Sequence, residues 1–157
     1  MESNYFGYVN IALAAIPHLQ KSDTASLTVV GSLAGRVGSP FVHAYSASKF
    51  AIDGFFNCLR HELAFQKENK IVITNCVLGA IGTQNFFDTV SVHSESVLKI
   101  AVSPEDTARR ILEGIVGREK QFYFPAFIQA QYVINSISPA LGYKILRIAH
   151  NLSDRTA

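Results

Sequence analysis

The sequence predicts an α/β fold built around a parallel sheet. Helical and strand-like patterns alternate along its 157 residues, and such alternation is typical of a parallel sheet with helices on its faces. The second strand-like run is continuously apolar, as expected of a strand that is covered on both faces. Because 48% of the residues are hydrophobic and only 17% are charged, we expect a folded domain with a real core.

The first half of the chain provides two helices and two strands. Apolar residues at helical spacing predict a helix over 4–20 that bends or ends near Pro17. The β-rich run at 26–31 predicts a strand, and a glycine-rich loop separates it from a long helix over 43–65. Residues 70–80 (KIVITNCVLGA) then form the continuously apolar strand.

The second half is predicted to be mostly helical. Residues 81–101 (IGTQNFFDTVSVHSESVLKIA) form a loop with room for one short helix. Ser103 is expected to cap a helix that has a proline and two acids in its first turn and ends at Gly117. The segment at 121–125 (QFYFP) predicts a third short strand, and the tail after it has helical spacing that is interrupted at Pro139.

Several function classes find no support in the composition. A formal net charge of +2 is too small to indicate nucleic-acid binding. The sequence contains no zinc, calcium or phosphate-loop motif, no basic leader followed by an apolar run, and no stretch of membrane-spanning length. Cys58 and Cys76 lie in apolar periodic segments, so we expect two buried free thiols.

Tyr45 and Lys49 stand four residues apart in the segment AYSASKFAIDGF, so a helix places them on one face. An ammonium close to a phenol stabilises the phenolate and lowers the tyrosine pKa from about 10 toward neutral pH. Such a tyrosine can serve as a general acid and base when a carbonyl and an alcohol interconvert. The pair by itself is equally consistent with two exposed residues on a helix surface.

Ser32 bears on the choice between these two interpretations. It stands at the carboxyl end of the strand 26–31, the edge at which open parallel sheets place their ligands. Taken alone, this serine is more typical of a turn. Together with Tyr45 and Lys49, however, it brings a hydroxyl, a phenol and an amine into one region, and small residues around the tyrosine leave space beside them.

The run TVVGSLAGRVGSPFVHAYSASKFAIDGFFNCLRHEL resembles the short-chain dehydrogenase/reductase family, in which a strand ending in serine precedes Tyr-x-x-x-Lys on a helix. The segments NYFGYVNIALAAIPHL, SLAGRVG, AYSASKFAIDGFF and CVLGAIGT are similar to its 11-beta-hydroxysteroid dehydrogenase type 1-like group. The resemblance implies the C-terminal part of a doubly wound parallel-sheet (Rossmann-like) domain. It would be a single incomplete domain over 1–157, with a catalytic half at 1–124 and a C-terminal helical tail at 125–157.

The resemblance implies roles for four polar residues. Ser32 would bind the substrate oxygen, and Tyr45 would pass the proton to it. Lys49 would lower the tyrosine pKa and hold the nicotinamide ribose, so that both it and Tyr45 contact the cofactor. The backbone of Asn4 would help to hold a proton-relay water, although a polar residue at this place is also typical of a helix start.

A further segment would border the nicotinamide. The family's Pro-Gly-x-x-x-Thr pattern appears here as LGAIGT, with leucine in place of proline. Residues 84–102 would form a mobile substrate loop, whose apolar members suit either a lipophilic substrate or packing within the loop. The expected cofactor-binding residues of the first segment are Leu78, Gly79, Ile81 and Thr83, and the apolar loop members are Phe86, Phe87, Val90 and Val97.

The family's dinucleotide-binding half finds no match in this sequence. Gly31, Gly35 and Gly38 follow a strand, but their spacing is wrong for a pyrophosphate-binding turn. Pro40 also stands where the phosphate-binding helix should begin, and Asp53 lies within a helix instead of closing a second strand. We therefore expect a chain without the N-terminal half, whose first strand has an exposed apolar edge.

The sequence is consistent with two functions. The first is an oxidoreductase that transfers hydride between NADP(H), or NAD, and a hydroxyl or ketone of a lipophilic, steroid-like substrate, with little activity in this chain alone. The alternative is a non-catalytic shortened isoform that acts by dimerisation through helices 4–20 and 43–65, or by contact of its tail with a membrane surface. The resemblance favours the endoplasmic reticulum or secretory pathway.

Overall fold

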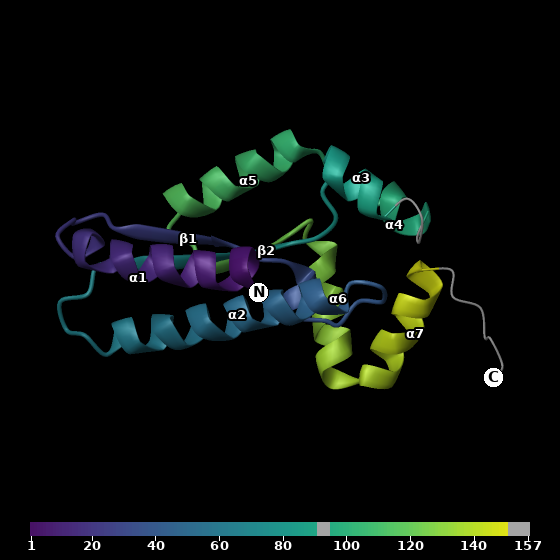
Figure 1. Ribbon diagram of the computed structural model, residues 1–157, viewed down its shortest axis with the longest axis horizontal. Coiled ribbons are helices and arrows are strands. Elements are labelled where there is room, and N and C mark those ends of the chain that lie inside the picture. Colours follow the sequence, from purple (N-terminus) through teal and green to yellow (C-terminus); the bar gives the residue numbers. More distant parts are fainter. Residues whose placement is uncertain (91–94, 151–157) are drawn as a thin grey trace.

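The computed structural model describes residues 1–90 and 95–150. Its described strands form one parallel sheet in the order β1–β2–β3, so the predicted α/β fold with a parallel sheet is confirmed. Helix α2 lies on one side of this sheet and α5 on the other (Figure 1). The bounds are β1 (Ser26–Val30), β2 (Val72–Leu78), β3 (Gln121–Phe124), α2 (His43–Ala64) and α5 (Pro104–Val116).

The central strand β2 is covered on both faces, as its continuously apolar sequence predicts. Side chains alternate along a strand, so Ile73 joins the core shared with β1 and α2, whereas Cys76 and Leu78 pack with Phe122 on the side of α5. Because all three strands are parallel, their carboxyl ends meet at one edge of the sheet. This is the edge at which the sequence places the polar candidate residues.

The first helical segment differs from the prediction at its start. A π-helical turn over Glu2–Phe6 precedes α1 (Gly7–Leu19), where the sequence predicted ordinary helix from residue 4. Such turns are rare and are frequently found at functional sites. Pro17 lies inside α1 but is exposed, so water can bond the carbonyl that it leaves unpaired. The helix ends two residues later, near the proline as predicted.

The segment 84–102 contains more helix than the sequence predicted. Two short helices, α3 (Gln84–Val90) and α4 (Glu95–Lys99), occupy it instead of one. Thr83 provides the start signal that the prediction overlooked, because its Oγ1 accepts a hydrogen bond from a backbone N–H in the first turn of α3 at 3.2 Å. The side chain of Val90, one of the apolar members of the predicted loop, lies outside what the structure describes.

Two serine–proline steps start helices in the second half; the start at Ser103 was predicted, whereas for Pro139 the sequence predicted only an interruption. Ser103 Oγ accepts a backbone hydrogen bond at 3.0 Å at the start of α5, and Ser138 Oγ accepts one at 3.4 Å at the start of α7 (Pro139–Ala149). Helix α6 (Phe127–Ile137) precedes this second step, and the two helices extend from one end of the sheet (Figure 1). Within residues 1–90 and 95–150, no helix combines the length and apolarity needed to cross a membrane.

The two cysteines differ in exposure. Cys76 in β2 is fully buried, whereas Cys58 on α2 is exposed, so the prediction of two buried thiols is wrong for Cys58. The helical spacing explains this difference: the buried Phe56 and Leu59 point toward the sheet, and Cys58 lies between them on the outer face. Both thiols are free.

Candidate active site

Ser32 lies directly beyond the carboxyl end of β1. It caps the short 3-10 turn Leu33–Gly35, because its Oγ accepts a hydrogen bond from the Ala34 N–H at 3.2 Å. The cap uses the oxygen of the hydroxyl as an acceptor only. The hydrogen of the same hydroxyl is therefore available to an acceptor on the neighbouring helix or on a ligand.

Tyr45 and Lys49 lie on one face of the first two turns of α2, as their spacing predicts. Tyr45 is 41% exposed, whereas Lys49 is only 8% exposed. The Lys49 ammonium donates a hydrogen bond to the Val30 carbonyl at 3.2 Å and lies 5.7 Å from the centre of the Tyr45 ring. The structure thus brings Ser32, Tyr45 and Lys49 together at one edge of the sheet.

The pKa shifts of this group follow from burial and one hydrogen bond. Burial raises the pKa of Tyr45, a hydrogen bond with Ser32 lowers it and the nearby Tyr8 raises it, and the net direction is upward. Burial lowers the pKa of Lys49. The net direction of the Tyr45 pKa is opposite to the one expected for a phenol beside an ammonium, because the effect of burial outweighs that of Ser32. Ser32 is the group that favours the phenolate in this structure.

Asn4 contacts the same region through Ser48. The Asn4 side-chain amide donates to Ser48 Oγ at 3.3 Å, and the Ser48 hydroxyl donates to the Tyr45 carbonyl at 2.6 Å. Ser48 is 1% exposed, so this link is buried. The side chain of Asn4 therefore fixes the π-helical turn against the start of α2, in addition to the backbone role that the resemblance implies.

The segment 78–83 crosses the carboxyl end of β2. Leu78 is 3% exposed and packs with Phe122 in the core, so its side chain is not available to a ligand at this edge. The Gly79 N–H donates a hydrogen bond to a carbonyl of β3 at 2.8 Å, and Ile81 forms a parallel β-bridge with Val102, just before α5. Thr83 is exposed. The segment thus offers its backbone and Thr83 to a ligand, and a contact of Leu78 with the cofactor would have to come from its backbone.

The sequence reasoning missed Tyr8. The centre of its ring lies 5.1 Å from Lys49 Nζ, nearer than that of Tyr45, and an ammonium is attracted to the face of an aromatic ring. Tyr8 therefore forms part of the wall around the buried ammonium. Its position four residues after Asn4, one helical turn along, was the signal that could have found it.

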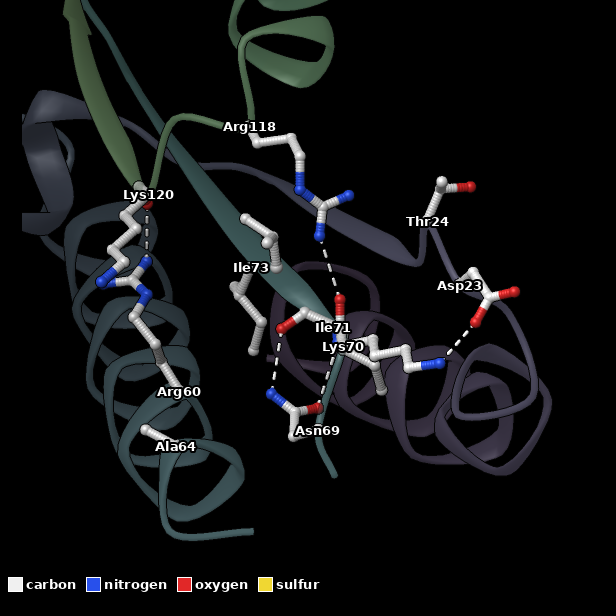
Figure 2. A pocket seen from close by; sticks show the side chains of 11 residues that line it. Asp23, Thr24, Arg60, Ala64, Asn69, Lys70, Ile71, Ile73, Arg118 and Lys120 are labelled. Carbon is white, nitrogen blue, oxygen red and sulfur yellow. Dashed lines mark hydrogen bonds and ion pairs between the residues drawn. The ribbon is translucent and has the colours of Figure 1, made fainter. Parts of the chain in front are cut away.

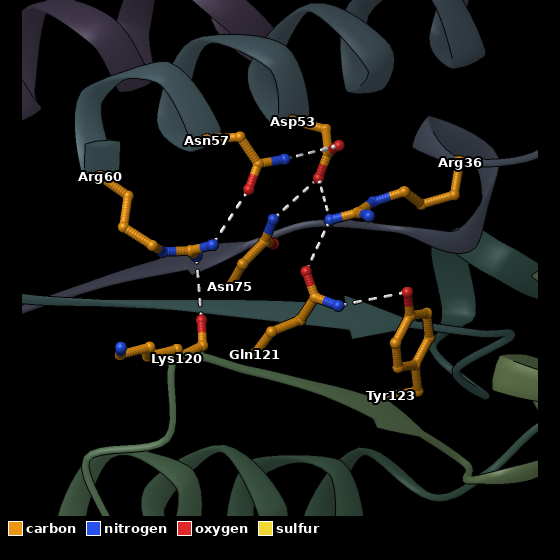
Figure 3. Close-up of polar contacts among 8 residues, drawn as sticks. All are labelled: Arg36, Asp53, Asn57, Arg60, Asn75, Lys120, Gln121 and Tyr123. Carbon is orange, nitrogen blue, oxygen red and sulfur yellow. Dashed lines mark hydrogen bonds and ion pairs between the residues drawn. The ribbon is translucent and has the colours of Figure 1, made fainter. Parts of the chain in front are cut away.

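A second missed group lies between α2 and the sheet, next to the candidate site (Figure 3). Asp53 of α2 forms an ion pair with Arg36 at 2.7 Å and accepts a hydrogen bond from Asn75 of β2 at 2.8 Å. Arg36 also donates to Gln121 of β3 at 2.7 Å. These partners are distant in sequence, so no local pattern could have predicted the group.

The residues at the carboxyl edge fit the nicotinamide end of a dinucleotide. The Lys49 ammonium has three N–H donors, and the Val30 carbonyl accepts one of them. A buried ammonium needs further acceptors, and the hydroxyls of a ribose are suitable ones. Tyr45 and Thr83 are exposed at the same edge and could contact such a ligand.

A large hollow elsewhere in the molecule is not a second candidate for this chemistry. It lies at the amino ends of the strands, opposite the candidate site, and is rimmed by basic residues (Figure 2). Three of these have local partners: Arg60 donates to the Lys120 carbonyl at 2.9 Å, Arg118 donates to the Lys70 carbonyl at 3.0 Å, and Lys70 pairs with Asp23. None of the predicted site residues lines this hollow.

Fold and site together define a Rossmann-like α/β protein with a tyrosine–lysine pair at the carboxyl edge of its sheet. A family model described as short chain dehydrogenase matches residues 1–91, which is more than half of the chain. The chain therefore belongs to the short-chain dehydrogenase family.

Known relatives extend this assignment along the chain. The chain is 42% identical over 154 residues to the chicken (Gallus gallus) hydroxysteroid 11-beta-dehydrogenase 1-like protein, covering 98% of this chain and 51% of the relative. The protein of the same name from Xenopus tropicalis is 36% identical over 129 residues, which is 82% of this chain and 43% of the relative. The chain thus spans about half the length of the curated relatives that it matches.

A solved structure confirms the fold. The crystal structure of a short chain dehydrogenase from Burkholderia cenocepacia in complex with NADP superposes with a TM-score of 0.76 at 23% identity. The superposition covers 93% of this chain and 56% of the other. At this identity the likeness supports the Rossmann-like architecture alone.

Proposed function

We propose that this chain provides the catalytic half of an oxidoreductase that transfers hydride between a nicotinamide dinucleotide and a hydroxyl or ketone. The placement of Ser32 and Tyr45 at one edge of the sheet, with the buried Lys49 ammonium 5.7 Å from the Tyr45 ring centre, is the observation that carries this proposal. Hydride arrival turns a carbonyl oxygen into an alkoxide, which requires a proton donor and a hydrogen-bond donor at the same place. The edge of the sheet provides both.

Each of these residues has a separate task. The dinucleotide, when bound, supplies or accepts the hydride. The Ser32 hydroxyl donates a hydrogen bond to the substrate oxygen, where negative charge develops during reduction. Tyr45 gives that oxygen a proton in reduction and removes it in oxidation. Lys49 binds ribose hydroxyls through the donors that the Val30 carbonyl leaves available.

The proposed cofactor is NADP(H), with NAD as the alternative, and the proposed substrate is lipophilic and steroid-like. Support for the cofactor comes from the NADP in the Burkholderia structure, and support for the substrate from the hydroxysteroid names of the relatives. Phe87, on α3 beside the carboxyl edge, is 40% exposed and offers an apolar contact. The family resemblance alone is the ground for proposing a location in the endoplasmic reticulum or secretory pathway.

The proposed domain is incomplete, with a catalytic half over 1–124 and a helical tail over 125–157. Affinity for a dinucleotide depends largely on pyrophosphate contacts at a glycine-rich turn, and the sequence offers no such turn. We propose that this chain alone has negligible hydride-transfer activity. Micromolar NADPH binding in a fluorescence titration of the chain would contradict this part of the proposal.

The function is tested by assaying the gene product that contains this chain against a panel of steroid and short aliphatic ketones. We expect NADPH oxidation with at least one steroid ketone, faster than with NADH. Reduction of the short ketones alone would contradict the substrate class, and a preference for NADH would contradict the cofactor. No turnover with any ketone, and none with the corresponding alcohols and NADP, would contradict the oxidoreductase function.

A non-catalytic role is the second candidate, and exposed apolar side chains favour it. Ile11 and Leu13 on α1 are 72% and 51% exposed, and Phe50 on α2 is 45% exposed, as residues covered by a second copy would be. Such a homodimer would use helices 4–20 and 43–65. Analytical ultracentrifugation tests this candidate: a chain that remains monomeric at high micromolar concentration would contradict it.

Contact of the tail with a membrane surface is the other non-catalytic possibility. Ile137 of α6 and Tyr143 and Ile148 of α7 are 80%, 62% and 77% exposed, and an exposed apolar helix face can enter a lipid interface. Co-sedimentation with vesicles of phosphatidylcholine and phosphatidylserine measures this contact. A chain that stays in the supernatant would contradict it, whatever the outcome of the ultracentrifugation.

A further inference from the structure

The turn after β1 is a rigid unit with Ser32 at one end and Arg36 at the other. The Gly35 N–H bonds the Ser32 carbonyl at 2.9 Å, and the Arg36 N–H bonds the Leu33 carbonyl at 2.8 Å. Ser32 Oγ also accepts the Ala34 N–H at 3.2 Å. Because these bonds tie the backbone together from Ser32 to Arg36, a contact that anchors Arg36 also restrains the backbone at Ser32.

The Arg36 side chain joins three other elements of the fold. Its guanidinium pairs with Asp53 of α2 at 2.7 Å and donates to Gln121 of β3 at 2.7 Å. It also lies over the ring of Tyr132 in α6, 5.5 Å from the ring centre. The Arg36 and Asp53 side chains are 12% and 20% exposed, so their attraction is little weakened by water.

The contacts around Arg36 close into a ring. Gln121 donates to the Tyr123 hydroxyl at 3.2 Å, and Tyr123 stacks on Tyr132 with ring centres 5.8 Å apart. Tyr132 in turn lies under the Arg36 guanidinium. Each contact in such a ring limits the movement of the next, which fixes the guanidinium more firmly than the ion pair alone would.

Asp53 shares a helix face with the proposed catalytic pair. Tyr45, Lys49 and Asp53 follow each other at intervals of four residues, so they form one stripe along α2. The turn touches this stripe at two places: Gly35 packs against the Lys49 backbone, and Arg36 binds Asp53. The two contacts hold the turn in a single register against the helix.

We propose that Arg36, through its ion pair with Asp53, is a positioning residue that holds the Ser32 hydroxyl against the Tyr45 phenol. The inference deepens the proposed function and rests on it for its catalytic meaning. The structural effect can be measured without an activity assay: without the Arg36 side chain, the hydrogen bond between Ser32 and Tyr45 is lost or weakened although the fold persists.

The test detects the hydrogen bond through the carbon-13 chemical shift of the Tyr45 side chain. The chain is labelled with carbon-13 at the tyrosine Cζ, the Tyr45 signal is assigned from Tyr45→Phe, and Ser32→Ala defines the chemical shift without the hydrogen bond. We expect Arg36→Met to move the Tyr45 signal most of the way to the Ser32→Ala position. The double variant should show little further change, because both substitutions remove the same interaction.

Arg110→Met is the matched control. Arg110 on α5 binds Glu119 with two contacts of 2.9 Å and lies 3.9 Å from the centre of the Phe122 ring, but it is on the other side of the sheet. Its loss should lower the melting temperature without moving the Tyr45 signal. Arg36→Lys and Asp53→Asn provide milder variants in case Arg36→Met does not fold, and each should move the signal part of the way.

The outcomes separate the inference from the proposed function. A folded Arg36→Met chain with the wild-type Tyr45 signal, while Ser32→Ala moves it, would show that Arg36 is merely structural and overturn the inference alone. Unchanged signals in folded Arg36→Lys and Asp53→Asn would overturn it equally. If Ser32→Ala itself leaves the Tyr45 signal in place, the hydrogen bond is absent, and both the inference and the proposed site are contradicted.

Discussion

Gly35 packs directly against the backbone of Lys49, so that a Cβ at Gly35 would lie only 2.6 Å from the Lys49 carbonyl oxygen. This contact brings the turn that carries Ser32 within reach of the helix that carries Tyr45. A side chain at position 35 would have to push the turn and the helix apart. The distance between the serine and the tyrosine therefore depends on a residue that takes no part in the chemistry.

Gly35→Ala is expected to destabilise the fold by about 1–3 kcal/mol, because the added methyl group meets backbone atoms that cannot move aside. Gly54→Ala is the control: its site on the exposed face of α2 has open space, and alanine should stabilise a helix interior by up to about 1 kcal/mol. Urea unfolding measures both. Equal effects of the two substitutions would contradict the close packing of the turn.

Lys49→Met tests the burial of the ammonium through the pH dependence of stability. Burial lowers the pKa of Lys49 below the ordinary lysine value of 10.5, so the unfolded chain holds this proton more tightly than the folded chain. Stability contributed by the group must therefore increase as the pH rises toward 10.5. We expect wild type to gain unfolding free energy relative to Lys49→Met between pH 7 and that value. A difference that does not change with pH would contradict the burial.

The two cysteines should react with a thiol reagent at very different rates. Cys76 is buried, and burial raises its pKa to about 11, so at pH 8 only about one molecule in a thousand carries the thiolate. Cys58 is exposed. Native chain should show one fast thiol, which Cys58→Ser abolishes and Cys76→Ala retains. Two fast thiols in the folded chain would place Cys76 at the surface.

Much of the fold follows from local pattern. The alternation of helices and strands, the double coverage of β2 and the capped start of α5 all depend on residues that are close in sequence. Periodicity and capping report such relationships well. The sequence did not predict the second short helix in 84–102 or the exposure of Cys58 on the outer face of α2. Tertiary packing decides whether a short helix forms and which face of a helix is buried.

The candidate site was predictable only in part. The spacing of Tyr45 and Lys49 is local, and the sheet edge then brings Ser32 to them. The bond from Lys49 to the Val30 carbonyl and the pair of Arg36 with Asp53 join residues 19 and 17 positions apart, which no periodic pattern encodes. Sequence reasoning therefore found the polar groups but not the contacts that orient them.

The central claim is that the Tyr45 phenol moves the proton during hydride transfer. The most direct test compares wild type, Tyr45→Phe and Tyr143→Phe in the gene product that contains this chain, by NADPH-dependent ketone reduction. Tyr143 is an exposed tyrosine on α7, outside the site, and its substitution should leave the rate unchanged. We predict that Tyr45→Phe lowers kcat by about 10²–10⁴-fold. A Tyr45→Phe protein that retains the wild-type kcat would contradict the account.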